Sequence, residues 1–172
     1  MPSSELAQLT VPDADAMRAL GVRLASMLRP GDLVVLSGAL GAGKTTFTQG
    51  IGQGLGVRGP VTSPTFVIAR EHPSAHDGPP LVHVDAYRLG SLAELDDLDL
   101  DSALPESVTV VEWGEGLAEN LADAHVLVRI ERGSGQADHL NASPGPESLA
   151  EVGDPRVVTV VGVGTRWQGV HL

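Results

Sequence analysis

The feature that most constrains this chain is a glycine-rich segment around its only lysine. The segment runs from Gly38 to Thr45 with the sequence GALGAGKT, and the other ten of the 11 lysine and arginine residues are arginines. It matches the GxxxxGK[ST] phosphate loop, in which backbone N–H groups surround phosphate oxygens. The compact ammonium group of Lys44 suits such a loop better than a planar guanidinium group does.

The residues on either side of the loop predict the strand and the helix that this motif requires. Residues 33–37, with the sequence LVVLS, form a short, mostly apolar run that predicts a buried strand, and residues 46–55 predict a helix that ends at Gly56. Because this order directs a helix N-terminus at an anion, we expect a bound nucleoside triphosphate rather than an ordinary glycine-rich turn. Lys44 is expected to bridge the β- and γ-phosphates, and the Thr45 hydroxyl to ligate Mg²⁺. The loop residues expected to bind the nucleotide are Gly38, Leu40, Gly41, Ala42, Gly43, Lys44, Thr45 and Thr46.

Composition limits what the rest of the chain can be. With 172 residues, 42% of them apolar, we expect a single P-loop ATPase domain over residues 1–172. The absence of cysteine excludes disulfides, thiolate metal sites and cysteine nucleophiles. No apolar run follows the N-terminus or reaches transmembrane length, so we expect a cytoplasmic protein without membrane contact.

Charge argues against a nucleic-acid surface. The net charge is −11, the aromatic content is 3%, and the arginines are scattered along the chain. Nucleic-acid binding normally requires a basic patch, and single-stranded binding also uses aromatic stacking. We therefore expect any action on RNA to be indirect, through a partner.

The apolar pattern predicts an α/β fold with one loose insertion. Strands are expected at residues 6–11, 33–37, 66–70, 81–85, 108–111, 125–131 and 156–164. A helix is expected from Asp13 to about Pro30, and a capping box at Ser91 opens a second, short helix. Residues 133–155 are rich in Gly, Ser, Pro and Asp and predict a flexible loop.

Two acidic residues compete for the role of a carboxylate linked to the metal. Asp85 and Glu112 each end an apolar strand, at the edge where open α/β sheets bind their ligands. A carboxylate near Thr45 suits a Mg²⁺ ion held by few protein oxygens, and a second carboxylate could polarise the attacking water. Either acid could instead cap the turn after its strand, so the residues alone leave the two roles open.

Other polar segments give weaker indications. The TSPT sequence at residues 62–65 lies where many NTPases sense the γ-phosphate, which makes Thr65 a candidate nucleotide contact; a rigid connector is the alternative. The six histidines lack a metal-ligand spacing such as HExxH, which argues against zinc. The acidic run at residues 96–101 is most simply a solvated face, and alternatively a docking surface for a basic partner.

Several nucleotide-dependent activities fit a phosphate loop. A guanine-reading Asn-Lys-x-Asp motif cannot exist here because Lys44 is the only lysine, so ATP is favoured over GTP. A small-metabolite kinase is one alternative to an ATPase, but the sequence shows no lid-like arginine cluster for a second phosphate-bearing substrate. A nucleotide-dependent switch protein with little catalysis is the other.

Four motifs in a fixed order resemble one bacterial family. They are LGAGKTTFT at residues 40–48, TSPTF at 62–66, HVDAYRL at 83–89 and VEW at 111–113. In order and spacing they are similar to the ATPase component of the tRNA threonylcarbamoyladenosine biosynthesis machinery, the TsaE family. The resemblance extends from the first helix to about residue 131, and TRW at 165–167 resembles the family's usual ending. Ala39 and Met17 are departures, since the family usually has Asp and often Thr at these positions.

The resemblance implies a fold, an activity and a set of roles. The fold is an α/β, P-loop NTPase-like three-layer sandwich with a central, mostly parallel β-sheet. The activity is Mg²⁺-dependent ATP hydrolysis that supports two related actin-fold-type subunits. Their complex transfers a threonylcarbamoyl group to the adenosine beside the anticodon of tRNAs reading ANN codons. By the resemblance, Lys44 holds phosphates, Thr45 and Glu112 ligate Mg²⁺, Asp85 assists hydrolysis, and Trp113 lies near the nucleotide or a partner.

Overall fold

The protein is described by a computed structural model that covers residues 1–64, 68–133 and 154–172. In chain order its elements are β1 (Ser3–Val11), α1 (Ala14–Ala25), β2 (Leu33–Gly38), α2 (Lys44–Leu55), β3 (Ala69–His72), β4 (Leu81–Asp85), α3 (Leu92–Asp96), α4 (Leu100–Ala103), β5 (Val108–Glu112), β6 (His125–Arg132) and β7 (Arg156–Val163). Short 3₁₀ turns occupy Leu104–Glu106, Glu119–Leu121 and Thr165–Trp167. Within these ranges no helix is long and apolar enough to cross a membrane.

The sheet has a parallel centre and antiparallel edges. Its strand order is β1-β7-β6-β2-β5-β4-β3. The four central strands β6, β2, β5 and β4 run parallel, whereas β1, β7 and β3 pair antiparallel with their neighbours. Since β2 lies between β6 and β5, its carboxyl end opens in the middle of the edge where parallel sheets bind ligands.

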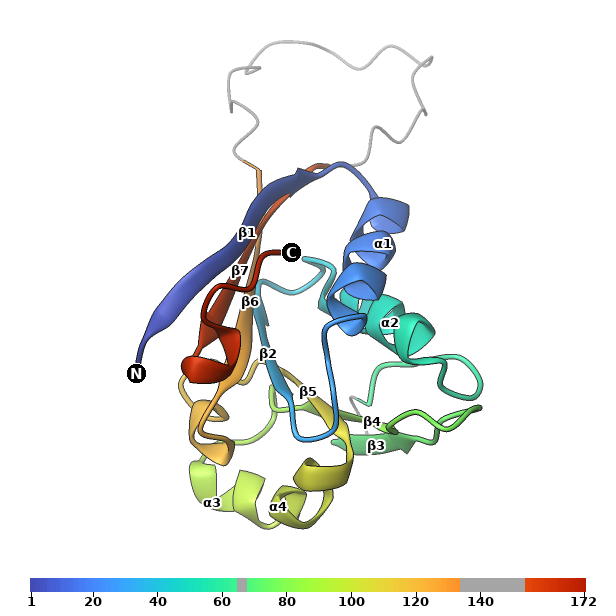
Figure 1. Ribbon diagram of the computed structural model, residues 1–172, viewed down its shortest axis with the longest axis vertical. Coiled ribbons are helices and arrows are strands. Elements are labelled where there is room, and N and C mark those ends of the chain that lie inside the picture. The colour runs from blue at the N-terminus through green and yellow to red at the C-terminus, as the bar shows by residue number, and fades with distance from the viewer. Residues whose placement is uncertain (65–67, 134–153) are drawn as a thin grey trace, which may run out of the picture.

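Helices cover both faces of this sheet. Figure 1 shows α1 and α2 packed together on one side, with α3 and α4 away from them. Alternate residues of β2 supply the two cores: Val34 and Leu36 pack with the α1 and α2 layer, and Leu33 and Val35 pack with the α3 and α4 layer. The predicted three-layer α/β fold is therefore confirmed, with the refinement that the sheet's edges are antiparallel.

Some boundaries differ from the sequence prediction. The strand expected at residues 66–70 is found at Ala69–His72, because Ile68 adopts a positive φ of 66° and donates a hydrogen bond from its N–H to Pro64 O. The helix expected to reach Pro30 ends at Ala25, after which the chain forms tighter turns. Residues 134–153, most of the predicted loop, lie outside the described residues.

Candidate functional site

The phosphate loop joins the carboxyl end of β2 to the N-terminus of α2. Gly43, directly before the helix, has a φ of 112°, a left-handed conformation that glycine adopts at low cost. A Cβ atom at Gly38 would lie 2.6 Å from the Ile130 carbonyl oxygen, so a side chain does not fit between the loop and β6. These two glycines explain how the chain turns over the sheet edge and enters the helix.

Lys44 is the first residue of α2, and its side chain folds back over the loop. Its Nζ donates hydrogen bonds to Gly38 O at 2.6 Å and to Ala39 O at 2.9 Å. Burial lowers the pKa of Lys44 from its ordinary value, while the nearby carboxylates of Glu112 and Asp85 act in the opposite direction. The site therefore contains a cation that is largely shielded from water and bonded to neutral oxygens.

The two strand-end acids are neighbours with different partners. Asp85 and Glu112 are register partners at the carboxyl ends of β4 and β5, and both are buried. Glu112 Oε1 accepts a hydrogen bond from Thr45 Oγ1 at 3.0 Å, which connects β5 to the first turn of α2. Asp85 Oδ1 accepts a hydrogen bond from the Tyr87 N–H at 3.0 Å, at the turn that follows β4. One carboxylate is therefore tied to the phosphate loop, and the other to an adjacent turn.

Trp113 forms an aromatic wall beside the lysine. Its φ is 59°, a left-handed conformation that costs a bulky residue about 1–2 kcal/mol. The Lys44 Nζ lies 3.9 Å from the centroid of the Trp113 ring, and the Tyr87 ring centroid lies 4.9 Å from that of Trp113. The strained backbone thus coincides with a cation–π contact at the sheet edge.

Two hollows lie on either side of the loop. The first is a pocket of about 250 Å³ lined by Leu40, Gly41, Gly43, Lys44, Thr45, Thr46, Ser63, Asp85, Glu112 and Trp113. The second, of about 650 Å³, lies between the loop, the N-terminal part of α1 and the start of β7. Because Gly41, Gly43 and Thr46 line both, the hollows adjoin each other along the loop.

The oxygen atoms in the smaller pocket suit a magnesium ion. Thr45 Oγ1 and Glu112 Oε1 lie 3.0 Å apart, and both are hard oxygen donors of the kind that Mg²⁺ prefers. In the part of the chain that the structure describes, no group of three or more His, Asp or Glu side chains gathers to hold a metal. Mg²⁺ typically takes only one or two protein oxygens and completes its coordination with phosphates and water, so this small donor set fits it.

Comparison with known proteins identifies the family. The sequence model of "Threonylcarbamoyl adenosine biosynthesis protein TsaE" matches residues 11–139. The chain belongs to the TsaE family. It is therefore a member of a family involved in the biosynthesis of threonylcarbamoyladenosine in tRNA, as the resemblance of its motifs predicts.

Relatives of the TsaE family resemble the chain over most of its length. The chain is 60% identical to the tRNA threonylcarbamoyladenosine biosynthesis protein TsaE of Streptomyces coelicolor over 152 residues, which cover 88% of this chain and 93% of the relative. It is 35% identical to the Bacillus subtilis TsaE protein over 153 residues, or 88% and 82% of the two chains. The crystal structure of Bacillus subtilis YdiB superposes with a TM-score of 0.67 at 29% identity, covering 98% of this chain and 92% of that chain.

Most residues predicted for a TsaE-type site lie at the smaller pocket, with three exceptions. Ala42 lines the larger cavity instead, and Gly38 supports the loop from the end of β2. Thr65 lies outside the described residues, whereas Ser63 of the same segment lines the pocket.

Two residues near the site were missed by the sequence analysis. His83 Nε2 lies 2.8 Å from Glu112 Oε1, and the available signal was its place at the start of the HVDAYRL motif, two residues before Asp85 on one strand. Arg156, at the start of β7, donates hydrogen bonds from Nε to Ala42 O at 3.2 Å and from Nη2 to Gly41 O at 3.4 Å. No local pattern predicts the second contact, because it joins segments 114 residues apart.

Proposed function

We propose that this TsaE-family chain is a Mg²⁺-dependent ATP-binding and ATP-hydrolysing subunit. It supports the complex that forms threonylcarbamoyladenosine next to the anticodon of tRNAs reading ANN codons. The observation that carries the ATPase part is the convergence of Lys44, Thr45, Asp85 and Glu112 on one pocket at a phosphate loop. Family membership supports the process, and a cytoplasmic location belongs to the same proposal.

The two hollows around the loop match two parts of ATP. The triphosphate occupies the smaller pocket, and the adenosine extends along Gly41 and Gly43 into the larger cavity, where Met17 lies on the wall. Lys44 exchanges its two carbonyl partners for phosphate oxygens, because charge-assisted hydrogen bonds between two ions are stronger than those to neutral oxygens. Trp113 covers the lysine from the side and limits the access of water.

The two carboxylates have separate tasks in hydrolysis. Thr45 and Glu112 hold Mg²⁺, which neutralises phosphate charge when bound. Asp85 orients the attacking water and accepts its proton, because its carboxylate lies in the same pocket but is not the one bonded to Thr45. The Tyr87 N–H holds the Asp85 carboxylate in place for this task.

The isolated chain hydrolyses ATP slowly. An arginine finger can add roughly 10³–10⁵ to the rate of a phosphoryl-transfer enzyme. Among the described residues, none of those that line the smaller pocket is an arginine. The transition-state charge is therefore stabilised only partly until a partner completes the site.

The proposed partners are the two actin-fold-type subunits of the threonylcarbamoyl-transfer complex. Leu40 and Tyr87 are 81% and 62% exposed beside the nucleotide pocket, which suits a protein contact there.

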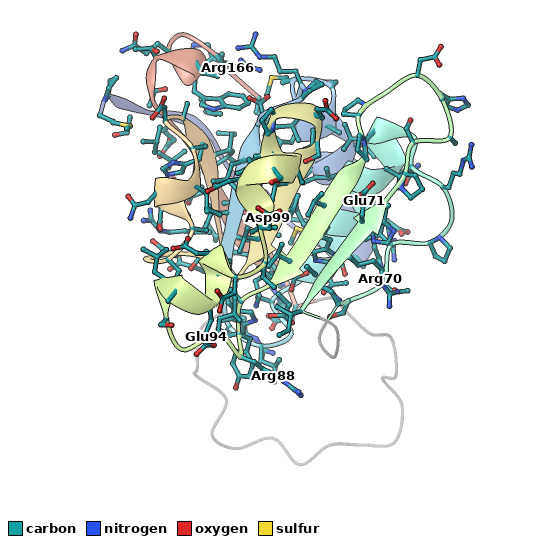
Figure 2. The ribbon with its side chains drawn as sticks, turned by 90° about the horizontal axis from the view of Figure 1, so that it is seen from below. Arg70, Glu71, Arg88, Glu94, Asp99 and Arg166 are labelled. Carbon is teal, nitrogen blue, oxygen red and sulfur yellow. The ribbon has the colours of Figure 1, made fainter. Side chains whose placement is uncertain are left out.

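A second surface suited to a partner is acidic. Glu94 in α3 lies with Arg88 at one end of the molecule, and Arg166 lies at the other (Figure 2). The exposed acids between the start of α3 and the end of α4 are Glu94, Asp96, Asp97, Asp99 and Asp101. This acidic surface favours a basic protein surface over tRNA, so contact with tRNA is indirect.

Phosphate release tests the proposal directly. The purified chain is assayed with Mg-ATP, alone and with the two partner subunits, and Lys44→Ala is the matched control. We expect a slow basal rate, a clear increase with the partners, and neither with Lys44→Ala. Equal rates with and without partners, or tight salt-sensitive binding of tRNA by the isolated chain, would contradict the partner-dependent role. Labelling of a small-molecule acceptor would indicate a kinase instead.

A further inference from the structure

His83 is a buried polar side chain at the centre of an otherwise apolar strand. It lies in β4, whose sequence is LVHVD, and its exposed fraction is 0%. Burying a polar ring costs free energy unless hydrogen bonds replace those made with water. Among the described atoms, His83 Nδ1 has no hydrogen-bond partner. An apolar residue would stabilise this strand position better, so a histidine here points to a role other than packing.

The one side-chain hydrogen bond of His83 that the structure gives ends on the proposed magnesium ligand. His83 Nε2 lies 2.8 Å from Glu112 Oε1, and Thr45 Oγ1 donates to the same oxygen at 3.0 Å. A carboxylate oxygen can only accept, so the hydrogen atom resides on His83 Nε2. Two donors from two different elements, β4 and α2, therefore hold a single oxygen of Glu112.

We propose that His83 is a positioning residue that fixes the Glu112 carboxylate for Mg²⁺, an inference that rests on the function proposed above. The terminal torsion of a glutamate has a broad energy minimum, so a carboxylate with one donor rotates more freely than one with two. Outer hydrogen bonds of this kind orient metal ligands, and their loss typically weakens metal binding by roughly 10–100-fold. His83 acts through Glu112 and does not contact the nucleotide.

The sheet register explains why β4 can supply this donor. Asp85 pairs with Glu112, and His83, two residues earlier, pairs with Val110 on the same parallel ladder. Side chains two residues apart point to the same face of a strand, so His83 and Asp85 both face the layer that contains α2. Strand β4 thus places Asp85, the proposed water-orienting acid, at the pocket, and His83, the donor to Glu112, one step further from the strand end.

His125 provides a natural comparison within the same sheet. It lies in β6, its side chain is also buried, and among the described atoms its Nδ1 has no hydrogen-bond partner. Glu112 receives its side-chain hydrogen bonds from Thr45 and His83. A substitution at His125 therefore perturbs a buried histidine without removing a donor from Glu112.

A pair of amide substitutions separates positioning from packing. In His83→Gln the side-chain amide nitrogen can take the place of Nε2, whereas in His83→Asn it reaches only the place of Nδ1. The affinity of a fluorescent, non-hydrolysable ATP analogue is measured with and without Mg²⁺. The Kd without Mg²⁺ divided by the Kd with Mg²⁺ gives the metal coupling. We expect His83→Asn to reduce this ratio by roughly tenfold or more, His83→Gln to keep most of it, and the His125→Gln control to leave it unchanged.

Thermal unfolding of each variant is followed in parallel. His83→Leu, which removes the donor without adding an unpaired polar group, must show the same loss of coupling and replaces His83→Asn if that variant does not fold. Coupling equal to wild type in a folded His83→Asn or His83→Leu chain would overturn the inference and leave the proposed function standing. A wild-type chain that binds the analogue equally well with and without Mg²⁺ would overturn both.

Discussion

The two tryptophans of this chain lie at opposite ends of the sheet, each beneath a cation. Lys44 Nζ lies 3.9 Å from the centroid of the Trp113 ring, and Arg166 Cζ lies 4.2 Å from that of Trp167. Arg166 also donates to Asp32 Oδ2 at 3.1 Å and to Met27 O at 2.8 Å, so its charge is matched by a carboxylate. Trp167 is fully buried.

The Lys44 end lacks this internal compensation. The two hydrogen bonds of Lys44 Nζ go to neutral carbonyl oxygens, and in the described part of the chain no carboxylate lies within ion-pair distance of it. Trp113 has a strained backbone, and a pocket adjoins it. The Arg166–Trp167 pair is therefore part of the core. In the similar Lys44–Trp113 pair, the hydrogen-bond partners of the cation can be exchanged for a ligand.

The largest expected effect comes from removing the exchangeable cation. Lys44→Ala should weaken binding of Mg-ATP by roughly 10²-fold or more, because each hydrogen bond to a charged group contributes about 1.5–3 kcal/mol and no second lysine can replace it. The fold should remain intact, since no carboxylate loses an ion-pair partner. Calorimetric titration and circular dichroism measure the two quantities. A folded variant with near-wild-type affinity would show that Lys44 does not hold phosphate.

The next effect separates the two carboxylates at the same end. Glu112→Gln should remove most of the dependence of nucleotide binding on Mg²⁺, because this carboxylate accepts the Thr45 hydroxyl. The loss of metal affinity should be at least the roughly 10–100-fold that follows removal of an outer hydrogen bond to a metal ligand. Asp85→Asn should slow turnover more than it weakens binding. Metal titration with a non-hydrolysable ATP analogue, together with single-turnover hydrolysis, tests both. The opposite result, with metal coupling lost in Asp85→Asn alone, means that the two roles are exchanged.

Arg166→Met should show the reverse pattern at the other end. The substitution leaves Asp32, whose side chain is 8% exposed, without its ion-pair partner. We expect a loss of about 2 kcal/mol in the free energy of unfolding, below the ~3–5 kcal/mol of a fully buried pair because Arg166 is partly exposed. ATP affinity should not change. Urea denaturation measures the first quantity, and a weakened nucleotide affinity in the folded variant would mean that the two ends are coupled.

The smallest effect concerns pH at the Arg166 end, where His125 begins β6. Burial lowers the pKa of His125 from its ordinary value of 6.5, and Glu119 acts against that shift. The unfolded chain therefore binds this proton more readily, so stability is complete above the unfolded pKa and declines as the pH falls below it. Between pH of about 8 and 5, His125→Gln should give a flatter stability profile than wild type. Parallel profiles would show that this histidine does not contribute.

The sequence predicts the local parts of this molecule well. The glycine pattern and the apolar run before it define β2, the phosphate loop and α2, because each depends on neighbouring residues alone. The ends of β4 and β5 are also predictable, and a parallel sheet brings such ends to one edge, as it does for Asp85 and Glu112. The roles of these residues remain predictions.

Contacts that depend on tertiary arrangement are not predictable in this way. His83 reaches Glu112 only because β4 and β5 pair in one particular register. Arg156 reaches the phosphate loop because β7 pairs antiparallel with β6, which places the start of β7 near Ala42 although the two lie 114 residues apart in the sequence. The start of β3 differs from the expected position because Ile68 forms a turn with Pro64, which strand propensity does not encode.

Nucleotide binding at the Lys44 end is tested directly by tryptophan fluorescence in two single-tryptophan chains. Trp167→Phe leaves only Trp113, and Trp113→Phe leaves only Trp167. Each is titrated with a non-hydrolysable ATP analogue and Mg²⁺, up to concentrations at which calorimetry shows saturation. We expect a saturable change from Trp113, lost on adding Lys44→Ala, and a constant signal from Trp167. A constant Trp113 signal during demonstrated binding, or a change confined to Trp167, would contradict it.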